Sequence, residues 1–256
     1  MVFPQFGQPK KEMTQHGFAR TSNWMLETNT ITDSSAAVTF SLHDSEATQA
    51  VWPHPFKLEY TVTLSDDALT CSLLVRNTGV GVFSVHTLLH TYLSVPSIEG
   101  ISVTGFEGRE YVDKVRDCEV GVDGRERADI RGEVDRVMTG SVDAQIGTVV
   151  LDIGVGGDMS VSLRRRVTIT ATAVLHTHTT TDPTDTSPLT HPVAHPLAHD
   201  VVFWNPWVDK ARALADLGDL DYISFVCVEP GTVSDWVSVT PAQTLTLTQT
   251  LTSTCM

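Results

Sequence analysis

The chain has 256 residues, a length that suits either one large all-β domain or two small domains. Its 31 acidic residues outnumber 17 scattered basic ones and leave a net charge of −14. This balance argues against a nucleic-acid-binding protein, whose surface needs clustered positive charge. Hydrophobic residues make up 41% of the chain, which supplies enough apolar material for a sizeable core.

The N-terminal residues carry no targeting pattern. Residues 1–7 lack a basic stretch followed by an apolar one, so we expect no signal peptide. No apolar run anywhere approaches the ~20 residues needed to cross a bilayer. We therefore expect a cytoplasmic protein with no membrane partner. Residues 15–20 form a short polar segment with one glycine for close approach, and its Arg20 would suit a phosphate if a pocket lay nearby.

Strand patterns dominate the rest of the chain. Residues 56–64 alternate apolar and polar side chains, a turn signal follows, and residues 69–75 and 82–95 read as further strands. Other β-type runs are 101–106, 148–153, 167–175, 222–228, 233–239 and 244–251. One short helix is expected at 210–217. Short strands between Gly, Asp and Asn clusters predict an all-β protein built as a β sandwich.

Two segments depart from the strand pattern. Residues 121–132 are charged without apolar periodicity and predict an exposed loop. Residues 176–199 are rich in Pro, Thr and Ser, which predicts a flexible surface insertion without strands. Its potential metal ligands are His176, His178, His191, His195, His199, Asp182 and Asp185. Their spacing matches no zinc pattern, so we expect no metal there.

The four cysteines lie far apart in the sequence, with no CxxC spacing: Cys71, Cys118, Cys227 and Cys255. Cys71 and Cys227 sit in apolar runs, where a thiol usually acts as a small hydrophobic group. We expect neither a disulfide nor a zinc site.

His90 is the first candidate for chemistry. In the predicted strand around it, alternation places His86, Leu88 and His90 on one face. A histidine that shares a face with leucine is most often a core or wall residue. On a rigid strand facing a cleft, it would instead be a well-positioned general acid near neutral pH.

Two carboxylates are further candidates. Glu229 follows four apolar residues and precedes Pro230-Gly231, which predicts a turn that fixes its direction. It reads either as a solvated strand end or as a base at the lip of a pocket, with a pKa adjusted by partial burial. Asp135 lies in a short charged segment and, taken alone, is no more than a turn acid.

Seven stretches, in order along nearly the whole chain, carry a family resemblance. They are Phe3-Pro4-Gln5-Phe6-Gly7, Gln15-His16-Gly17-Phe18-Ala19-Arg20 with Trp24, His54-Pro55-Phe56, Leu89-His90-Thr91-Tyr92, Val134-Asp135-Arg136, Val202 to Trp207 with Lys210, and Val226-Cys227-Val228-Glu229-Pro230-Gly231. Together they resemble the glucose-6-phosphate 1-epimerase (hexose-6-phosphate mutarotase) family, relatives of the aldose 1-epimerases. The resemblance implies a galactose mutarotase-like β-supersandwich, formed here as a single domain over residues 1–256.

The resemblance also implies roles for six residues. His90 and Glu229 match the catalytic His and Glu, and the positions that bind the sugar or its phosphate correspond to Gln15, His16, Arg20 and Asp135. The implied reaction interconverts the α and β anomers of a hexose 6-phosphate by acid–base ring opening and closure. It needs no metal and no organic cofactor. We expect a monomer whose only partner is a sugar or sugar phosphate.

The chain departs from the family pattern in two places. Relatives begin well upstream of Phe3, with early strands and an arginine before a Gly-Gly segment, so we expect the first N-terminal strands and that cation to be absent. Met138 stands where relatives tend to carry an aromatic residue.

Two other functions remain open on the sequence. The first is a mutarotase of neutral aldoses. The second is a truncated, non-catalytic carbohydrate-binding relative. No sequence feature favours a purely structural role.

Overall fold

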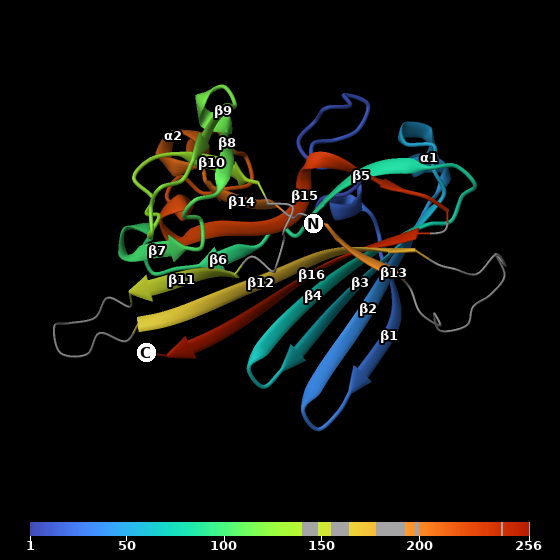
Figure 1. Ribbon diagram of the computed structural model, residues 1–256, viewed down its shortest axis with the longest axis horizontal. Coiled ribbons are helices and arrows are strands. Elements are labelled where there is room, and N and C mark those ends of the chain that lie inside the picture. Colours follow the sequence, from blue (N-terminus) through green and yellow to red (C-terminus); the bar gives the residue numbers. More distant parts are fainter. Residues whose placement is uncertain (140–147, 155–163, 178–192, 198–199, 242, 256) are drawn as a thin grey trace. The chain divides into compact units, whose positions relative to one another are not determined.

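The computed structural model describes residues 1–139, 148–154, 164–177, 193–197, 200–241 and 243–255 (Figure 1). The chain divides into two compact units. The first comprises Met1–Leu88, Thr172–Leu197 and Asp235–Gln249, and the second comprises Leu89–Ala171, Ala198–Ser234 and Thr250–Met256. Three strands contribute residues to both units: β12 (Arg164–Thr177), β15 (Phe225–Val239) and β16 (Gln243–Cys255).

The first unit is built mainly from antiparallel hairpins that lie side by side in Figure 1. Its other elements are η1 (Ala19–Thr21), β1 (Met25–Ile31), β2 (Ser35–His43), α1 (Glu46–Val51), β3 (Phe56–Ser65), β4 (Ala68–Asn77), β5 (Phe83–Leu88) and β13 (Val193–Leu197). The strand order is β1-β2-β3-β4-β16-β12, with β13 paired to β12, while β5 pairs with β15.

The register of these hairpins separates polar from apolar side chains. Phe40, Tyr60 and Leu73 are cross-strand partners on β2, β3 and β4. The adjacent row, one residue along each strand, lies on the opposite face because side chains alternate. There the Thr39 and Thr61 hydroxyls are hydrogen-bonded at 2.9 Å. The period-two pattern of the sequence is therefore expressed as one apolar and one hydroxyl-rich face.

Aromatic packing anchors the N-terminal segment of this unit. Phe3 is fully buried and lies 5.4 Å, between ring centroids, from both Trp52 and Phe56. Val2 and Leu88 exchange backbone hydrogen bonds, which fix this segment along β5. Residues 2–6 are thus a structural part of the first unit.

The second unit holds the remaining elements. They are β6 (Tyr92–Ser94), η2 (Ile98–Gly100), β7 (Ile101–Thr104), β8 (Glu110–Asp113), η3 (Lys114–Arg116), β9 (Glu119–Val122), β10 (Val134–Met138), β11 (Thr148–Gly154), β14 (Asp200–Asn205), α2 (Trp207–Ala213) and η4 (Asp221–Ser224). One set of strands runs β15-β14-β10-β8-β9, with β6 paired to β15, and another runs β12-β11-β7.

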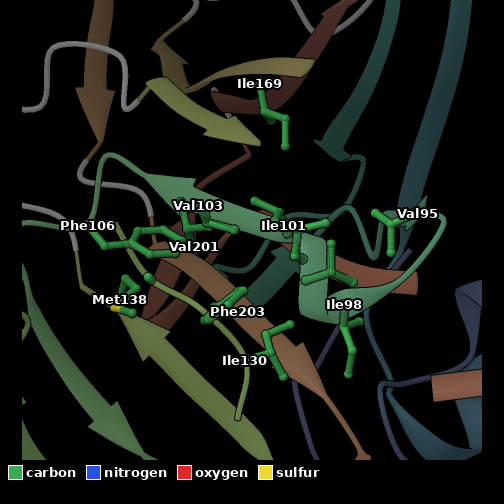
Figure 2. Close-up of a cluster of buried hydrophobic side chains, with 13 residues drawn as sticks. Val95, Ile98, Ile101, Val103, Phe106, Ile130, Met138, Ile169, Val201 and Phe203 are labelled. Atoms are coloured by element: carbon green, nitrogen blue, oxygen red, sulfur yellow. The ribbon is translucent and has the colours of Figure 1, made fainter. Parts of the chain in front are cut away.

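A buried hydrophobic cluster forms the core of the second unit (Figure 2). Phe203 of β14 and Phe106 pack with ring centroids 5.3 Å apart, and both are fully buried. Val226 and Val228 of β15 belong to the same cluster. Because these residues alternate along β14 and β15, one face of the two strands is committed to the core. The other face is left to Trp204, Cys227 and Glu229.

The strand-rich prediction is confirmed, and the differences have local causes. The expected strand 82–95 is interrupted after Leu88, so that β5 and β6 fall in different units. The expected turn at Pro230-Gly231 is wrong, because β15 continues through both residues, which pair with Val201 and Asp200 of β14. The expected helix begins earlier, at Trp207, and ends at Ala213.

Two predicted loops also need correction. Within 121–132, Asp123, Ala128 and Ile130 are buried, and Ala128 bridges to Val103 of β7, so the segment is not simply exposed. Within 176–199, β12 extends to Thr177, and β13 pairs with it. Pro196 is tolerated in β13 because that strand pairs only with β12 among the described strands. Residues 178–192 and 198–199 of this predicted insertion lie outside the described part of the chain.

Among the described residues, no helix combines the length and apolarity needed to span a bilayer.

Candidate active site

A row of chemically useful side chains crosses four neighbouring strands of the second unit. Cys227 of β15 pairs with Tyr92 of β6 and with Trp204 of β14, and Trp204 pairs with Asp135 of β10. Glu229 follows Cys227 by two residues, so both side chains leave β15 on the same face. This is the face opposite to the hydrophobic core.

His90 joins this row from the segment between β5 and β6. It does not lie within a strand, contrary to the sequence prediction, and it is in a different unit from His86. Its Nδ1 lies 3.4 Å from Oε1 of Glu229. The next residue holds the segment against β15, because the Val228 amide donates a hydrogen bond to the Thr91 carbonyl. The predicted acid–base pair is therefore brought into contact by the fold.

Two aromatic rings orient His90. The Tyr92 ring stacks on the imidazole with centroids 4.9 Å apart and planes at 14°. The Trp204 ring meets it edge-on at 6.0 Å. Tyr92 is 55% exposed, whereas the His90 side chain retains 22% exposure. The imidazole is thus held between rings and is still reachable from solvent.

Glu229 is almost fully buried, with 1% of its surface exposed. Burial raises its pKa well above the ordinary value for a glutamate, and the negative charge of Asp135 raises it further, while Lys114 opposes the shift. The Cys227 thiol also hydrogen-bonds to Glu229. A carboxyl group with a raised pKa is a stronger base than an ordinary glutamate, which suits it to accept and return a proton.

Asp135 lies on β10 among charged neighbours. Burial raises its pKa, while the cations Lys114 and Lys210 oppose the rise. Lys210 of α2 lies 3.8 Å from the Asp135 carboxylate and 2.9 Å from Glu133. Asp135 can thus accept a hydrogen bond from a sugar hydroxyl while the lysines balance its charge.

Cys227 is a residue of this site that the sequence interpretation did not assign. Its place in an apolar run predicts a small hydrophobic residue, and it is fully buried. The signal was nevertheless present: two residues separate it from Glu229, and strand alternation requires both to share a face. Burial and the neighbouring Glu229 raise the pKa of its thiol, so the side chain is a neutral donor.

The other predicted substrate residues lie in the first unit. Gln15 and His16 are in contact through their side-chain nitrogens at 3.3 Å, and the Gly7 amide donates to Nδ1 of His16. Arg20 is exposed at the 3-10 turn η1. The expected close approach at Gly17 is made by the protein itself, since an added Cβ there would collide with the Phe3 carbonyl.

His86, which shared a predicted face with His90, has a structural role. It is buried and stacks on Trp236 with centroids 3.8 Å apart. The Phe6 amide donates a hydrogen bond to its Nδ1. Burial lowers its pKa to about 4, with Asp235 opposing the shift, so the ring is neutral near pH 7. This agrees with the expectation that a histidine sharing a face with leucine is most often a core or wall residue.

Comparison with known proteins gives one family match and several similar chains. The sequence profile of the aldose 1-epimerase family matches residues 1–252. A protein from Cenchrus ciliaris, named provisionally as a glucose-6-phosphate 1-epimerase, is 27% identical over 251 residues, which are 95% of this chain and 65% of that protein. A Salmonella typhimurium protein with the same provisional name is 28% identical and is covered over 64% of its length. The chain thus spans about two thirds of these relatives.

Solved structures show the same fold. The crystal structure of a protein from Salmonella typhimurium, provisionally called a mutarotase, superposes with a TM-score of 0.77 at 25% identity, over 100% of this chain and 73% of that one. A galactose mutarotase related enzyme from Lactobacillus acidophilus gives a TM-score of 0.64 at 16% identity, over 99% of this chain and 81% of that one. The fold is therefore the galactose mutarotase-like β-sandwich, as expected.

Proposed function

Because the chain belongs to the aldose 1-epimerase family, we propose that it interconverts the α and β anomers of a hexose 6-phosphate, with His90 and Glu229 as its acid–base pair. The observation that carries this proposal is the 3.4 Å contact between Nδ1 of His90 and Oε1 of Glu229. It places a proton donor beside a proton acceptor that β15 holds in position.

The reaction needs one proton removed and one supplied. Glu229 takes the proton of the C1 hydroxyl while His90, protonated, gives a proton to the ring oxygen. The C1–O5 bond then breaks and leaves an open-chain aldehyde. Rotation about the C1–C2 bond presents the other face of the carbonyl, and both proton transfers run in reverse as the ring closes. Each such transfer is typically worth ~10²–10⁴-fold in rate.

Other predicted site residues would hold the sugar. Asp135 accepts a hydrogen bond from a ring hydroxyl. Burial raises its pKa, while the positive charges of Lys114 and Lys210 favour the carboxylate form that accepts this bond. By the family resemblance, Gln15, His16 and Arg20 of the first unit are further candidates for sugar contacts, with the forked guanidinium of Arg20 suited to phosphate oxygens. The provisional names of the relatives support a phosphorylated substrate.

Exchange NMR of the anomers of glucose 6-phosphate tests the catalytic pair. We expect the wild-type chain to raise the exchange rate above that of buffer, and His90→Ala and Glu229→Gln each to remove ~10²–10⁴-fold of that enhancement. His43→Ala and Glu107→Gln change residues of the same types at exposed positions and should keep the wild-type rate. A wild-type chain that leaves the buffer rate unchanged, while still binding the sugar, would favour the carbohydrate-binding alternative.

A comparison of glucose 6-phosphate with galactose tests the substrate class. We expect the phosphorylated sugar to have the higher kcat/KM, and Arg20→Ala to raise KM for it while leaving galactose unaffected. Arg76→Ala, another exposed arginine of the first unit, is the control. Equal or better turnover of galactose would instead support a mutarotase of neutral aldoses.

A further inference from the structure

A cluster of three different metal-ligating side chains lies within the candidate active site. One nitrogen of His90, Sγ of Cys227 and a carboxylate oxygen of Glu229 all lie within 4.8 Å of one another. From these positions we infer that the site binds one zinc ion or a similar soft divalent cation through His90, Cys227 and Glu229, and that this ion inhibits the enzyme. The inhibition, but not the binding, rests on the proposed function.

The distances suit a tetrahedral ion. Ligands bound to zinc at about 2.0–2.3 Å and at tetrahedral angles lie about 3.4–3.6 Å apart. The observed separation of 3.4 Å between His90 Nδ1 and Glu229 Oε1 meets this requirement without movement. Cys227 and Glu229 leave the same face of β15, and the ligand atoms of all three residues already lie within 4.8 Å of one another.

The donor set selects the ion. Imidazole nitrogen, thiolate sulfur and carboxylate oxygen are the ligands that zinc uses in proteins, whereas magnesium and calcium prefer oxygen alone. Three protein ligands leave a fourth position for water. Cys227 and Glu229 are buried, and of the three ligands only the His90 side chain, at 22% exposure, remains partly open to solvent.

Binding would occupy both catalytic groups. The metal takes the lone pair of His90 and an oxygen of Glu229, and the Cys227 thiol loses its proton to solvent as the metal–sulfur bond forms. Neither partner can then carry a proton for the sugar. The site requires no CxxC spacing in the sequence, because the fold assembles it from two separate segments.

Cobalt(II) titration of the reduced chain tests the site, because thiolate ligation gives a near-ultraviolet charge-transfer band that histidine and carboxylate ligation does not. We expect a band that saturates at one Co²⁺ per chain and is displaced by Zn²⁺. Cys227→Ser should abolish it, and Cys118→Ser, an exposed cysteine elsewhere in the same unit, should keep it. Ions bound by the histidines of residues 176–199 do not produce this band.

Affinity and inhibition complete the test. His90→Ala should weaken Co²⁺ binding by more than the about 10–100-fold typical of outer-shell changes, whether or not Cys227→Ser folds. Zn²⁺ should stop anomer exchange in the wild-type chain, and a chelator should restore it. No band in the wild-type chain, or a band retained in Cys227→Ser, would overturn the site. A band formed by a chain without exchange activity would overturn the proposed function and leave the metal site standing.

Discussion

The electrostatic interaction of Glu229 with Asp135 has a measurable consequence. Burial raises the pKa of Glu229, and the charge of Asp135 adds to that rise. A base must be deprotonated to work, so activity falls as pH drops through the pKa of Glu229. In Asp135→Asn this pKa is lower, and we expect the acid limb of the kcat/KM profile to move to lower pH. Asp219→Asn, an exposed control, should leave the acid limb in place. If Asp135 acts only in sugar binding, Asp135→Asn should leave the acid limb unchanged as well.

The burial of Glu229 also predicts how stability depends on pH. A group whose pKa is raised by folding stabilises the fold fully at pH values below its unfolded pKa, near 4.3, and loses that contribution as pH rises toward the folded value. Glutamine does not titrate, so Glu229→Gln does not lose stability in this way as the pH rises. We expect the variant to gain stability relative to wild type above pH 4.3, by up to about 1.4 kcal/mol per pH unit, in urea unfolding. A pH-independent difference would contradict the raised pKa.

Gly17 is required for a steric reason in the first unit. Its φ of +74° is unfavourable for other residues, and a Cβ would meet the Phe3 carbonyl. We expect Gly17→Ala to lower the free energy of unfolding by at least about 2 kcal/mol. Gly81→Ala is the matched control, because its Cβ would meet no atom within 4 Å, and it should change stability by less than about 0.5 kcal/mol. Equal effects would contradict this role.

At the scale of elements, Asp200 at the start of β14 fixes β15 below the site. It is buried and accepts hydrogen bonds from the amides of Val233 and Ser234, at 2.7 Å each, and from the Ser234 hydroxyl. Asp200→Ala leaves the buried Val233 amide without an acceptor and removes the acceptor of Ser234, so we expect a loss of about 2–3 kcal/mol in urea unfolding. Asp219→Ala, at an exposed turn, should cost almost nothing. If Asp200→Ala lost as little stability as Asp219→Ala, the role of Asp200 in holding β15 would be contradicted.

The strands best predicted from the sequence are those with a clear alternation of side chains. Residues 56–64 and 69–75 were found within β3 and β4 because one face of each carries apolar side chains. Strand β1 was missed, since all of its residues are exposed and no apolar period marks it. The turn expected at Pro230 was wrong because local turn preference yielded to pairing with β14.

The local sequence pattern alone does not predict the roles of the candidate site residues. His90 and Glu229 were identified by resemblance, since each alone reads as a wall residue or a strand end. Their contact could not be derived from the sequence, because it joins residues 139 positions apart through the packing of two segments. The role of Cys227 could have been derived from alternation alone, but burial of a thiol in an apolar run favoured the simpler reading.

At the scale of the whole molecule, the expectation of a single domain stays a prediction that core substitutions can test. Trp52 is buried in the first unit and Phe203 in the second. Replacement of either by alanine should cost about 3–5 kcal/mol. If the chain unfolds as one domain, both variants shift the same cooperative transition, followed by circular dichroism and fluorescence. Two separate transitions, each moved by only one of the variants, would contradict that prediction.

The central claim is that His90 and Glu229 act as a coupled pair. Exchange NMR of glucose 6-phosphate anomers with the wild type, His90→Ala, Glu229→Gln and the double variant tests it most directly. Residues that act as a unit lose their effect together, so the double variant should be no slower than the slower single variant. Losses that multiply in the double variant, or a wild-type rate equal to that of buffer, would contradict the claim.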